Sequence, residues 1–405
     1  MSLSVEVHVG ERVAFYRKSQ GKKQAVVAGL AGIAPDYLSQ IERGKRVPTV
    51  AVLHRISQIL NVPVSVLLGE PAFEEHGVIH PTGKALHRVL TSYEPITPDT
   101  PAPDLADLRN RVNALWSAWQ TSPTRFTHVA PLVAGLTADV QLAVRSLRAS
   151  TEKDARKSVY QISSDLYFLL RTFSKRIGRP DLSMLVADRA VAAAEETDEP
   201  LRIAAAKWNM GQILLAQSEA EGAEDVAIRA SEDLRRETHV PLAEKAAMEG
   251  ALALVSTIAA VRKGDYWAAR ERLRNRALPA AKASGEGNVF WTVFGPLNVQ
   301  LHALSIEVEA GETSEALRQA DKIDLTRLPS AERRTTFALE VARCYDQRRD
   351  DAAVFLHLLN AEASGPEDLK YNVLARDLAR GLLKRARPTY APQVRAMAER
   401  IGLAG

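Results

Sequence analysis

Residues 28–49 read AGLAGIAPDYLSQIERGKRVPT, and this stretch decides the fold of the first part of the chain. Gly32 supplies a turn after one short helix, and Pro35 is well placed in the first turn of the next helix. In that next helix the spacing of Leu38 and Ile41 directs both side chains to the same, inner face. The pattern therefore predicts two short helices that are joined by a tight turn and leave a polar face outside.

The flanking residues extend this pair to five helices around a small core. Gly21 ends a first helix, and Thr49 can cap a fourth. The helices are expected at about residues 9–18, from residue 24 to the turn at Gly32, at 35–43, over the apolar positions of 52–60, and around Val66 and Leu67.

Most of the positive charge of the chain lies in this same segment. Residues 9–69 hold nine lysines and arginines against three acidic residues, a charge of +6, whereas the whole chain of 405 residues has a net charge of +4. The net charge of all the other residues together is therefore −2. A small basic segment is typical of a domain that binds the phosphates of nucleic acid, although a solvated basic surface has the same composition.

The segment resembles the phage-repressor-like helix-turn-helix family, often called the XRE family. The resemblance rests on Gln24-x-x-Val-Ala28, on the turn at Gly32-Ile33, and on the run from Tyr37 to Thr49. The family usually has a capping serine or threonine at the positions of Lys23 and Ala34. Each of these departures removes a helix cap worth about 1 kcal/mol.

The resemblance implies how the segment would bind double-stranded DNA. In this family the second helix of the motif enters the major groove, and its partner helix rests on the phosphate backbone. The residues expected to contact bases are Asp36, Ser39 and Gln40, of which Gln40 can pair bidentately with adenine. The residues expected to contact phosphates are Gln24, Tyr37, Arg43, Lys45 and Arg46. Glu42 is expected instead to brace the domain through an ion pair with Arg12 or Arg17.

The composition of the chain is that of an ordinary globular protein. Charged residues make up 25% and hydrophobic residues 46%. The single cysteine, Cys344, excludes an intramolecular disulfide and suits a reducing compartment. The N-terminal residues lack the basic and apolar regions of a signal peptide, and there is no run of about 18 apolar residues. We therefore expect a cytoplasmic, nucleoid-associated protein without a membrane span.

A proline-rich stretch separates the first segment from the rest. Residues 70–104 contain six prolines and two glycines, and only residues 84–91 look briefly helical. Proline at this density blocks regular helix and is typical of a semi-rigid linker. The predicted organisation is a helix-turn-helix domain at 9–70, a linker at 71–104 and a second domain at 105–405.

The remainder of the chain has helical periodicity throughout, so the predicted fold class is all-α. Turn signals recur at Gly178-Arg179-Pro180, Gly222, Gly264-Asp265, Gly311-Glu312 and Arg349-Asp350. Their spacing of about 38 to 47 residues suits stacked pairs of helices, each of which buries its apolar face on its neighbours. We interpret the region as degenerate tetratricopeptide-like repeats, with an irregular helical bundle as the alternative.

A second string resembles a segment of long actinobacterial regulators. It reads Trp291-Thr-Val-Phe-Gly-Pro-Leu-Asn298-Val-x-x-His302. In those proteins a phage-repressor-like domain precedes tetratricopeptide-like helices, which is the organisation expected here. The likeness to the peptide-sensing quorum regulators of Gram-positive bacteria is architectural only.

A curved array of helix pairs has a concave surface that can hold a small molecule or a peptide. Candidates for its lining combine aromatic rings with polar tips: Trp208, Asn209, Gln212, Trp267, Phe290, Trp291, Asn298 and His302. The alternative is that the aromatic residues simply form core. The two asparagines are stronger candidates, because a buried amide costs free energy unless it is hydrogen-bonded.

No enzyme motif is present in the sequence. It lacks a Gly-x-x-x-x-Gly-Lys phosphate loop, a His-Glu-x-x-His zinc motif and a Gly-x-Ser-x-Gly elbow. Cys344 is expected to be a small core residue, and His76, His80 and His87 lack the cysteines or carboxylates that complete a metal site. We expect no catalytic residue, no metal and no cofactor.

Together these observations predict a sequence-specific transcriptional regulator that binds a roughly palindromic operator as a homodimer. A small molecule or peptide bound in the helical domain would change the placement of the two N-terminal DNA-binding domains of the dimer, and so their affinity for DNA. Two alternatives remain. The helical domain could be a scaffold for another protein without a small ligand, or the chain could be the antitoxin-like half of a pair.

Overall fold

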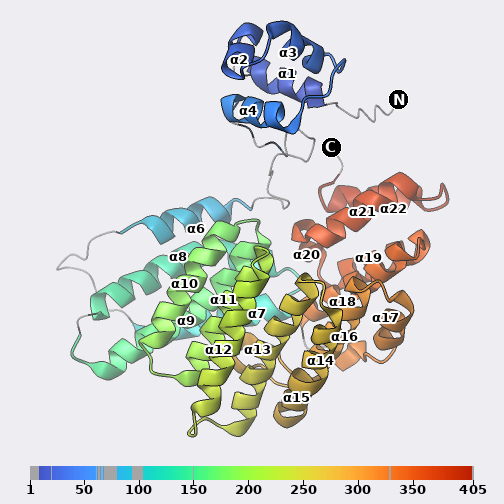
Figure 1. The fold of residues 1–405 in the computed structure, drawn as a ribbon. Helices are drawn as coiled ribbons and strands as arrows, with labels where there is room; N and C mark the ends of the chain where they lie inside the picture. Colours follow the sequence, from blue (N-terminus) through green and yellow to red (C-terminus); the bar gives the residue numbers. More distant parts are fainter. Residues whose placement is uncertain are drawn as a thin grey trace. The chain divides into compact units, whose positions relative to one another are not determined.

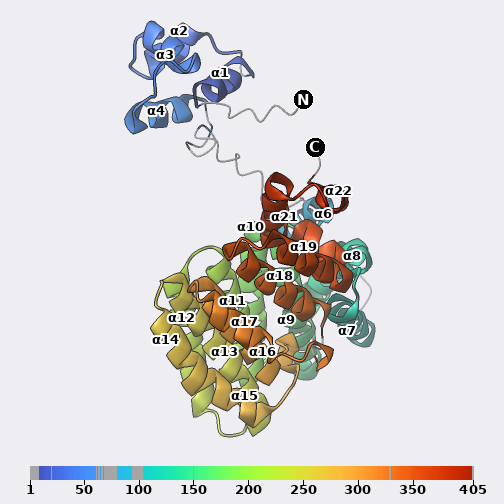
Figure 2. The same cartoon turned by 90° about the vertical axis from the view of Figure 1, so that its right-hand side faces the viewer.

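The computed structural model describes residues 9–19, 21–60, 62, 64, 67, 80–93, 104–148, 150–327 and 330–403. The chain divides into two compact units between residues 76 and 77. Every regular element in the described residues is a helix (Figures 1 and 2). The predicted all-α class is therefore confirmed for this part of the chain.

The N-terminal unit packs four described helices around one small core. They are α1 Val9–Ser19, α2 Gln24–Leu30, α3 Pro35–Glu42 and α4 Val50–Leu60. Val27, Leu38, Ile41 and Ile56 are fully buried in that core. The turn between α2 and α3 depends on Gly32, whose φ of 63° is open mainly to glycine. Four of the five predicted helices are thus confirmed. Of the fifth, Leu67 is buried in this core, whereas Val66 lies outside the described residues.

The two departures from the family pattern have the expected local effect. Lys23 and Ala34 precede α2 and α3 with extended backbones, and neither side chain caps its helix. Thr49 does cap α4, because its Oγ1 accepts a hydrogen bond of 3.4 Å from the backbone N–H of Val52. Two of the short helices therefore begin without a side-chain partner for their first N–H groups.

Replacing Ala34 with serine is expected to stabilise the N-terminal unit by about 1 kcal/mol. The backbone of Ala34, with φ −67° and ψ 141°, already has the conformation of a capping residue. Hydrogen exchange along α3 should slow by about fivefold, as measured by mass spectrometry on the whole chain. Ala51→Ser is the control, because exposed Ala51 lies in the first turn of α4, which Thr49 already caps, so serine there adds no cap to α3. Equal changes in the two variants would exclude capping as the cause.

The helix α6, Thr82–Thr91, corrects the predicted linker. It packs on α8, and its Leu86 and Leu90 are buried in the core of the second unit. These two residues are four apart and so share one helix face. The linker assignment is wrong for α6, while residues 71–79 and 94–103 lie outside the described residues.

The second unit consists of antiparallel helices stacked side by side (Figures 1 and 2). After α6 its helices are α7 Leu105–Thr121, α8 Arg125–Leu147, α9 Lys153–Arg176, α10 Pro180–Glu195, α11 Pro200–Ala216, α12 Ala220–Arg236, α13 Leu242–Arg262, α14 Tyr266–Arg272, α15 Leu278–Ser284, α16 Pro296–Glu309, α17 Thr313–Ala320, α18 Ala331–Gln347, α19 Asp351–Ser364, α20 Pro366–Tyr371, α21 Val373–Arg385 and α22 Ala391–Arg400. A π-helical turn at Leu273–Ala277 joins α14 to α15, and short 3-10 turns occur at Val289–Trp291 and Leu325–Arg327.

Most of the predicted turns separate the two helices of a pair. This holds for the turns between α9 and α10, α13 and α14, α16 and α17, and α18 and α19. Gly222 is the exception, because it lies within α12. The turn before α12 instead contains Ser218, which has a φ of 65° where the other turns mostly have glycine. A serine in this left-handed conformation gives no sequence signal.

The helix α8 is the one described helix that is long and apolar enough, by length and composition alone, to cross a membrane. Its Val129, Val133, Leu136 and Val140 are buried in the core of the second unit. A core helix passes the same test of length and hydropathy, so α8 is accounted for by packing.

Candidate nucleic-acid interface and central cavity

The three predicted base contacts lie together on α3. The Nε2 of Gln40 donates a hydrogen bond of 2.8 Å to Oδ2 of Asp36, one helical turn earlier, and both side chains remain accessible. Ser39 is half-buried beside them, and its carbonyl accepts a hydrogen bond of 3.1 Å from Nε of Arg43. The pairing with Asp36 orients the Gln40 amide before any ligand arrives, which reduces the entropy lost on binding.

Glu42 braces the N-terminal unit, as predicted, and its partner is Arg17. The two side chains form a bidentate pair, with distances of 2.6 Å from Nε to Oε1 and 2.8 Å from Nη2 to Oε2. Hydrogen bonding to Glu42 raises the pKa of Arg17. The Nε2 of Gln24 donates to the same Glu42 Oε2 at 3.0 Å. Gln24 therefore has a structural partner within the unit, and its contact with phosphate stays a prediction.

The other predicted phosphate contacts surround the end of α3. Arg43, Lys45 and Arg46 are exposed, and no described carboxylate forms an ion pair with any of them. The guanidinium of Arg46 lies over the ring of Tyr37 at 5.9 Å. These three cations are available to an external anion, which suits phosphate binding.

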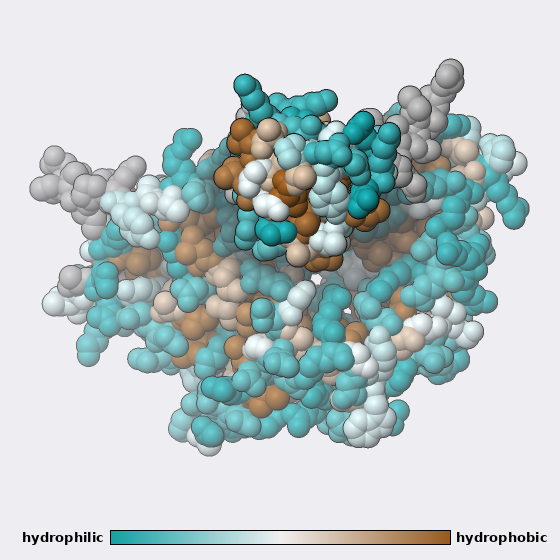
Figure 3. Space-filling model, turned by 45° about the horizontal axis from the view of Figure 1, so that its top comes forward, coloured by the Kyte–Doolittle hydropathy of each residue, from teal (hydrophilic) through white to brown (hydrophobic). Residues whose placement is uncertain are grey.

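Exposed apolar residues accompany this basic loop. Val47 and Val50 are 87% and 81% exposed, more than the other large apolar residues that the structure describes in the N-terminal unit. Figure 3 shows hydrophobic residues scattered among hydrophilic ones on the face in view, without one broad apolar patch. Two valines beside three cations offer methyl groups to sugars or thymines.

The second unit contains a cavity of about 530 Å³, lined by residues of α7, α9, α11, α13, α16, α18, α20, α21 and the segment 290–293. Seven of the eight residues proposed from the sequence meet there: Trp208, Asn209, Gln212, Phe290, Trp291, Asn298 and His302. Trp267 does not line this cavity. It is 76% exposed on α14, and its assignment to the lining was wrong.

Two of these polar residues are held by neighbouring groups. Oδ1 of Asn209 accepts a hydrogen bond of 2.8 Å from Nε of Arg171, and its Nδ2 donates to the carbonyl of Ala205 at 2.9 Å. Nδ1 of His302 lies 2.8 Å from the carbonyl of Asn298. Burial lowers the pKa of His302 to about 4, so this imidazole is neutral at pH 7. Oδ1 of Asn298 is buried and has no hydrogen-bond partner among the described residues.

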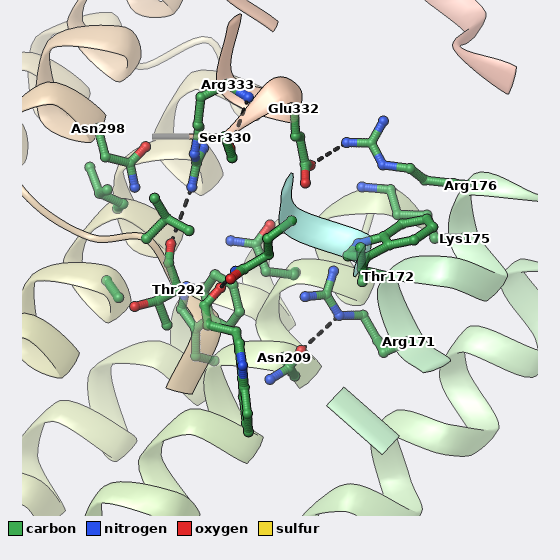
Figure 4. A pocket seen from close by; sticks show the side chains of 18 of the residues that line it. Arg171, Thr172, Lys175, Arg176, Asn209, Thr292, Asn298, Ser330, Glu332 and Arg333 are labelled. Carbon is green, nitrogen blue, oxygen red and sulfur yellow. Dashed lines mark hydrogen bonds and ion pairs between the residues drawn. The ribbon is translucent and has the colours of Figure 1, made fainter. Parts of the chain in front are cut away.

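Cations dominate the lining, which the sequence did not predict. Arg171, Lys175, Arg176, Arg262 and Arg333 line the cavity against one carboxylate, that of Glu332. Figure 4 shows Arg171, Lys175 and Arg176 along one helix, with Arg333 and Asn298 across from them. The sequence carried one signal: Arg171 and Lys175 are four residues apart and so share a face of α9. On an amphipathic helix that spacing usually indicates a solvated face.

Burial lowers the pKa values of two of these cations on α9, Arg171 and Lys175. It lowers the pKa of Arg171 to about 10. Burial, followed by repulsion from Arg171 and Arg176, lowers the pKa of Lys175 to about 8. The Lys175 side chain has solvent access, but protein atoms surround that solvent, which is why its charge is poorly hydrated.

Glu332 belongs to a buried ion-pair network beside the cavity. It pairs with Arg176 and, at 3.2 Å, with Nη1 of Arg125, while Arg125 also pairs with Asp368. Burial alone would raise the pKa of Glu332, but the nearby arginines outweigh it, so the pKa lies below its usual value. Arg125 is on α8, Arg176 on α9, Glu332 on α18 and Asp368 on α20. The network therefore joins the beginning of the helical array to its later part.

The segment that carries Trp291 has a strained backbone. Phe290, Trp291 and Val293 have φ values of 45°, 59° and 49°. Each such residue costs on the order of 1–3 kcal/mol unless its surroundings hold it. The Trp291 ring stacks on Trp116 at a centroid distance of 4.7 Å, and its carbonyl accepts a hydrogen bond of 3.3 Å from Gln120. These contacts hold two aromatic rings flat against one wall of the cavity.

Residues of metal and thiol chemistry do not form a site in the described residues. No group of three or more histidine, cysteine, aspartate or glutamate residues lies close enough there to hold a metal ion. His80 packs near the Phe173 ring, His87 is exposed, and His76 lies outside the described residues. Cys344 is fully buried in an apolar cluster, as expected of a core residue.

Known proteins resemble this chain mainly in its first unit. The profile of the helix-turn-helix family matches residues 13–67. The HTH-type transcriptional regulator SinR of Bacillus licheniformis is 40% identical over 63 residues, 15% of this chain and 57% of SinR. The uncharacterized HTH-type transcriptional regulator y4dJ of Sinorhizobium fredii is 41% identical over 54 residues, 13% of this chain and 70% of that protein. The chain thus spans little more than half of SinR.

One solved structure resembles the chain over almost its whole length. It is the apo form of the competence regulator ComR from Streptococcus vestibularis, which is 12% identical, with 98% of both chains covered and a TM-score of 0.30.

Proposed function

The chain belongs to the helix-turn-helix family of transcriptional regulators, and from this premise we propose that it is a dimeric, cytoplasmic regulator whose DNA affinity depends on a ligand bound in the second unit. The N-terminal unit binds DNA. SinR and y4dJ are both transcriptional regulators by name, and neither is an enzyme.

The observation that carries the DNA-reading part is the outer face of α3. Asp36, Ser39 and Gln40 lie on it, and Arg43 and Lys45, which pair with no described carboxylate, lie at its end. A helix of this kind fits the major groove, where Gln40 pairs with adenine and Asp36 accepts from cytosine. The cations bind phosphates on either side and position the helix without reading sequence. Gln24 and Tyr37 are proposed to add contacts to the backbone.

We infer dimerisation because the DNA-binding helix of a single copy contacts few bases. One α3 helix reaches too few bases for useful specificity, and two copies match a two-fold operator. In the second unit, α19 and α21 pack on each other and expose Leu356, Leu359 and Leu383. We assign these leucines to the surface between two copies.

The cavity supports the ligand-dependent part of the proposal. A volume of about 530 Å³ lies in the range of small-molecule sites. Its walls come from repeats far apart in the sequence, so a bound ligand changes how these repeats pack. In a dimer this change alters the placement of the two readers, and with it the affinity for the operator.

Gln40→Ala is expected to lower the preference for operator over random DNA by about 1–3 kcal/mol, because it removes one bidentate base contact. Arg43→Ala should weaken binding to both DNAs and reduce the slope of affinity against salt by about 1, because it removes a phosphate contact. Fluorescence anisotropy at two salt concentrations, with DNA from upstream of the gene, measures both effects.

Gln58→Ala is the control for these variants, because Gln58 is an exposed glutamine of α4 whose one hydrogen bond within the described residues is to His54. It should bind both DNAs as the wild type does. Sedimentation of the complex counts the copies on each operator. If the wild type shows no salt-dependent binding even to longer genomic DNA fragments, the DNA-binding proposal fails. The alternative that the helical domain is a scaffold for another protein is then favoured.

A further inference from the structure

The cavity of the second unit holds more positive charge than its own residues neutralise. Glu332 is engaged by Arg176 and Arg125. Arg171 and Lys175 form no ion pair with any described residue. Arg171 is only 7% exposed, and its hydrogen-bond partner is the neutral amide of Asn209. A buried, unpaired guanidinium costs several kcal/mol unless an anion accompanies it.

The opposite side of the cavity adds a third cation and an unused acceptor. Arg333 on α18 donates to the carbonyl of Thr292 at 3.2 Å and forms no ion pair with a described residue. Asn298 is 6% exposed, and its Oδ1 has no hydrogen-bond partner in the part of the chain that the structure describes. A buried acceptor without a donor marks a place where a ligand N–H or O–H can bind.

Flat aromatic surfaces line the same cavity. Trp116 and Trp291 are stacked with an angle of 6° between their rings. The ring of Trp208 lies 5.4 Å from the guanidinium of Arg171, so an apolar surface and a cation adjoin each other. Nε1 of Trp119, another lining residue, is a buried donor that finds no acceptor among the described residues.

We propose that the cavity binds a small, flat organic anion. Arg171 and Lys175 hold its acidic group, carboxylate or phosphate, by charge-assisted hydrogen bonds. Its apolar body packs on the tryptophans, and a donor on its far side meets Oδ1 of Asn298. This inference rests on the proposed function in one respect: the anion is the ligand that alters DNA affinity.

Anilinonaphthalene sulfonate and N-phenylnaphthylamine form a matched pair of fluorescent probes, because they differ only by the anionic group. Lys175→Gln is expected to lower the affinity for the anionic probe about tenfold, because it removes one charge-assisted hydrogen bond. The neutral probe should bind both proteins alike. Energy transfer from tryptophan shows that the probe binds the second unit, because all five tryptophans lie there.

Lys282→Gln is the control, because Lys282 is an exposed lysine of α15 outside the cavity. It should change the affinity of neither probe. Circular dichroism must show the same Tm for all three proteins, because unfolded protein also binds these dyes. The proposal is overturned if the anionic probe binds Lys175→Gln as it binds the wild type, or if both probes weaken equally.

Displacement of the anionic probe tells the two acidic groups apart. Naphthoate and naphthyl phosphate are compared with neutral naphthamide. The anion that displaces the probe at the lower concentration identifies the preferred acidic group as carboxylate or phosphate. If neither displaces the probe better than the amide does, the anion site does not exist.

A pH series gives a second readout. Lys175 faces Arg171 and Arg176 on α9, Arg262 on α13 and Glu332 on α18, and its pKa is about 8. Its charge is present below that pH and lost above it. Affinity for the anionic probe should therefore fall between about pH 7 and pH 9 in the wild type and stay flat in Lys175→Gln.

These measurements contain no DNA, so they separate the two proposals. If the anion binds through Lys175 but never changes operator affinity, the site stands and ligand-dependent regulation fails. If operator binding depends on Gln40 but the affinity for the probes does not change in Lys175→Gln, the DNA-binding function stands and the anion site fails.

Discussion

The Gly10→Ala variant is expected to lose most of its DNA binding, because a methyl group does not fit between α1 and α3. A Cβ at Gly10 would lie 1.7 Å from the carbonyl oxygen of Ile41 and 2.7 Å from its carbon. Both are backbone atoms of the helix that carries the base contacts, so α1 and α3 must move apart. We expect a cost of at least about 3 kcal/mol, most of the stability of a small domain.

Hydrogen exchange over α1–α4 in the whole chain measures this loss, because all five tryptophans lie in the second unit and report nothing about the first. Gly29→Ala is the matched control. A Cβ at this exposed position of α2 meets no atom within 4 Å, so alanine should stabilise the unit by about 0.5–1 kcal/mol. Wild-type exchange and DNA affinity in Gly10→Ala would disprove the tight packing of α1 on α3.

The second large effect is expected from Asp368→Ala, which should destabilise the second unit by about 3–5 kcal/mol. Arg125 is completely buried, and Asp368, itself 1% exposed, is one of its two carboxylate partners. Without Asp368 the Arg125 guanidinium, 4.3 Å from the ring of Trp119, is left buried and only partly neutralised. Tm, followed by tryptophan fluorescence, should fall by roughly 5–10 °C.

Two further variants identify the cause. Arg125→Met combined with Asp368→Leu removes both charges, leaves Arg176 with Glu332, and should recover most of the lost stability. Asp377→Ala breaks an exposed pair with Arg380 and should change stability by no more than about 0.5 kcal/mol. If Asp368→Ala costs no more than Asp377→Ala, the buried network contributes nothing to stability.

The N-terminal unit could be predicted closely because its signals are local. Gly32 and Pro35 mark the helix boundaries, and Leu38 and Ile41 mark the buried face, all within one short stretch. Even the weak points were visible, since Ala34 leaves α3 without a cap. The ion pair of Glu42 was also expected, but a choice between Arg12 and Arg17 needs the helix packing.

The second unit could be predicted less well because its decisive features depend on distant segments. Trp208 and Trp291 were recognised as cavity residues, but Trp267 carries the same local signal and is exposed on α14. Lys175 looks like a solvated charge until α13 and α18 are packed around it. The prolines around α6 concealed a core helix, because proline restricts the backbone at its own position and does not exclude packing by its neighbours.

The network of Arg125, Arg176, Glu332 and Asp368 also affects how the helical array comes apart. A linear stack of repeats unravels from its termini, because each terminal repeat touches one neighbour only. Here α8 and α9 are tied by buried charges to α18 and α20, which lie some two hundred residues further along the chain. The helices between these two ends are therefore held in a closed arrangement. None of them can separate from its neighbours unless the ion-pair network also breaks. Strain in one helix pair is therefore shared by all the helix pairs that lie between α9 and α18.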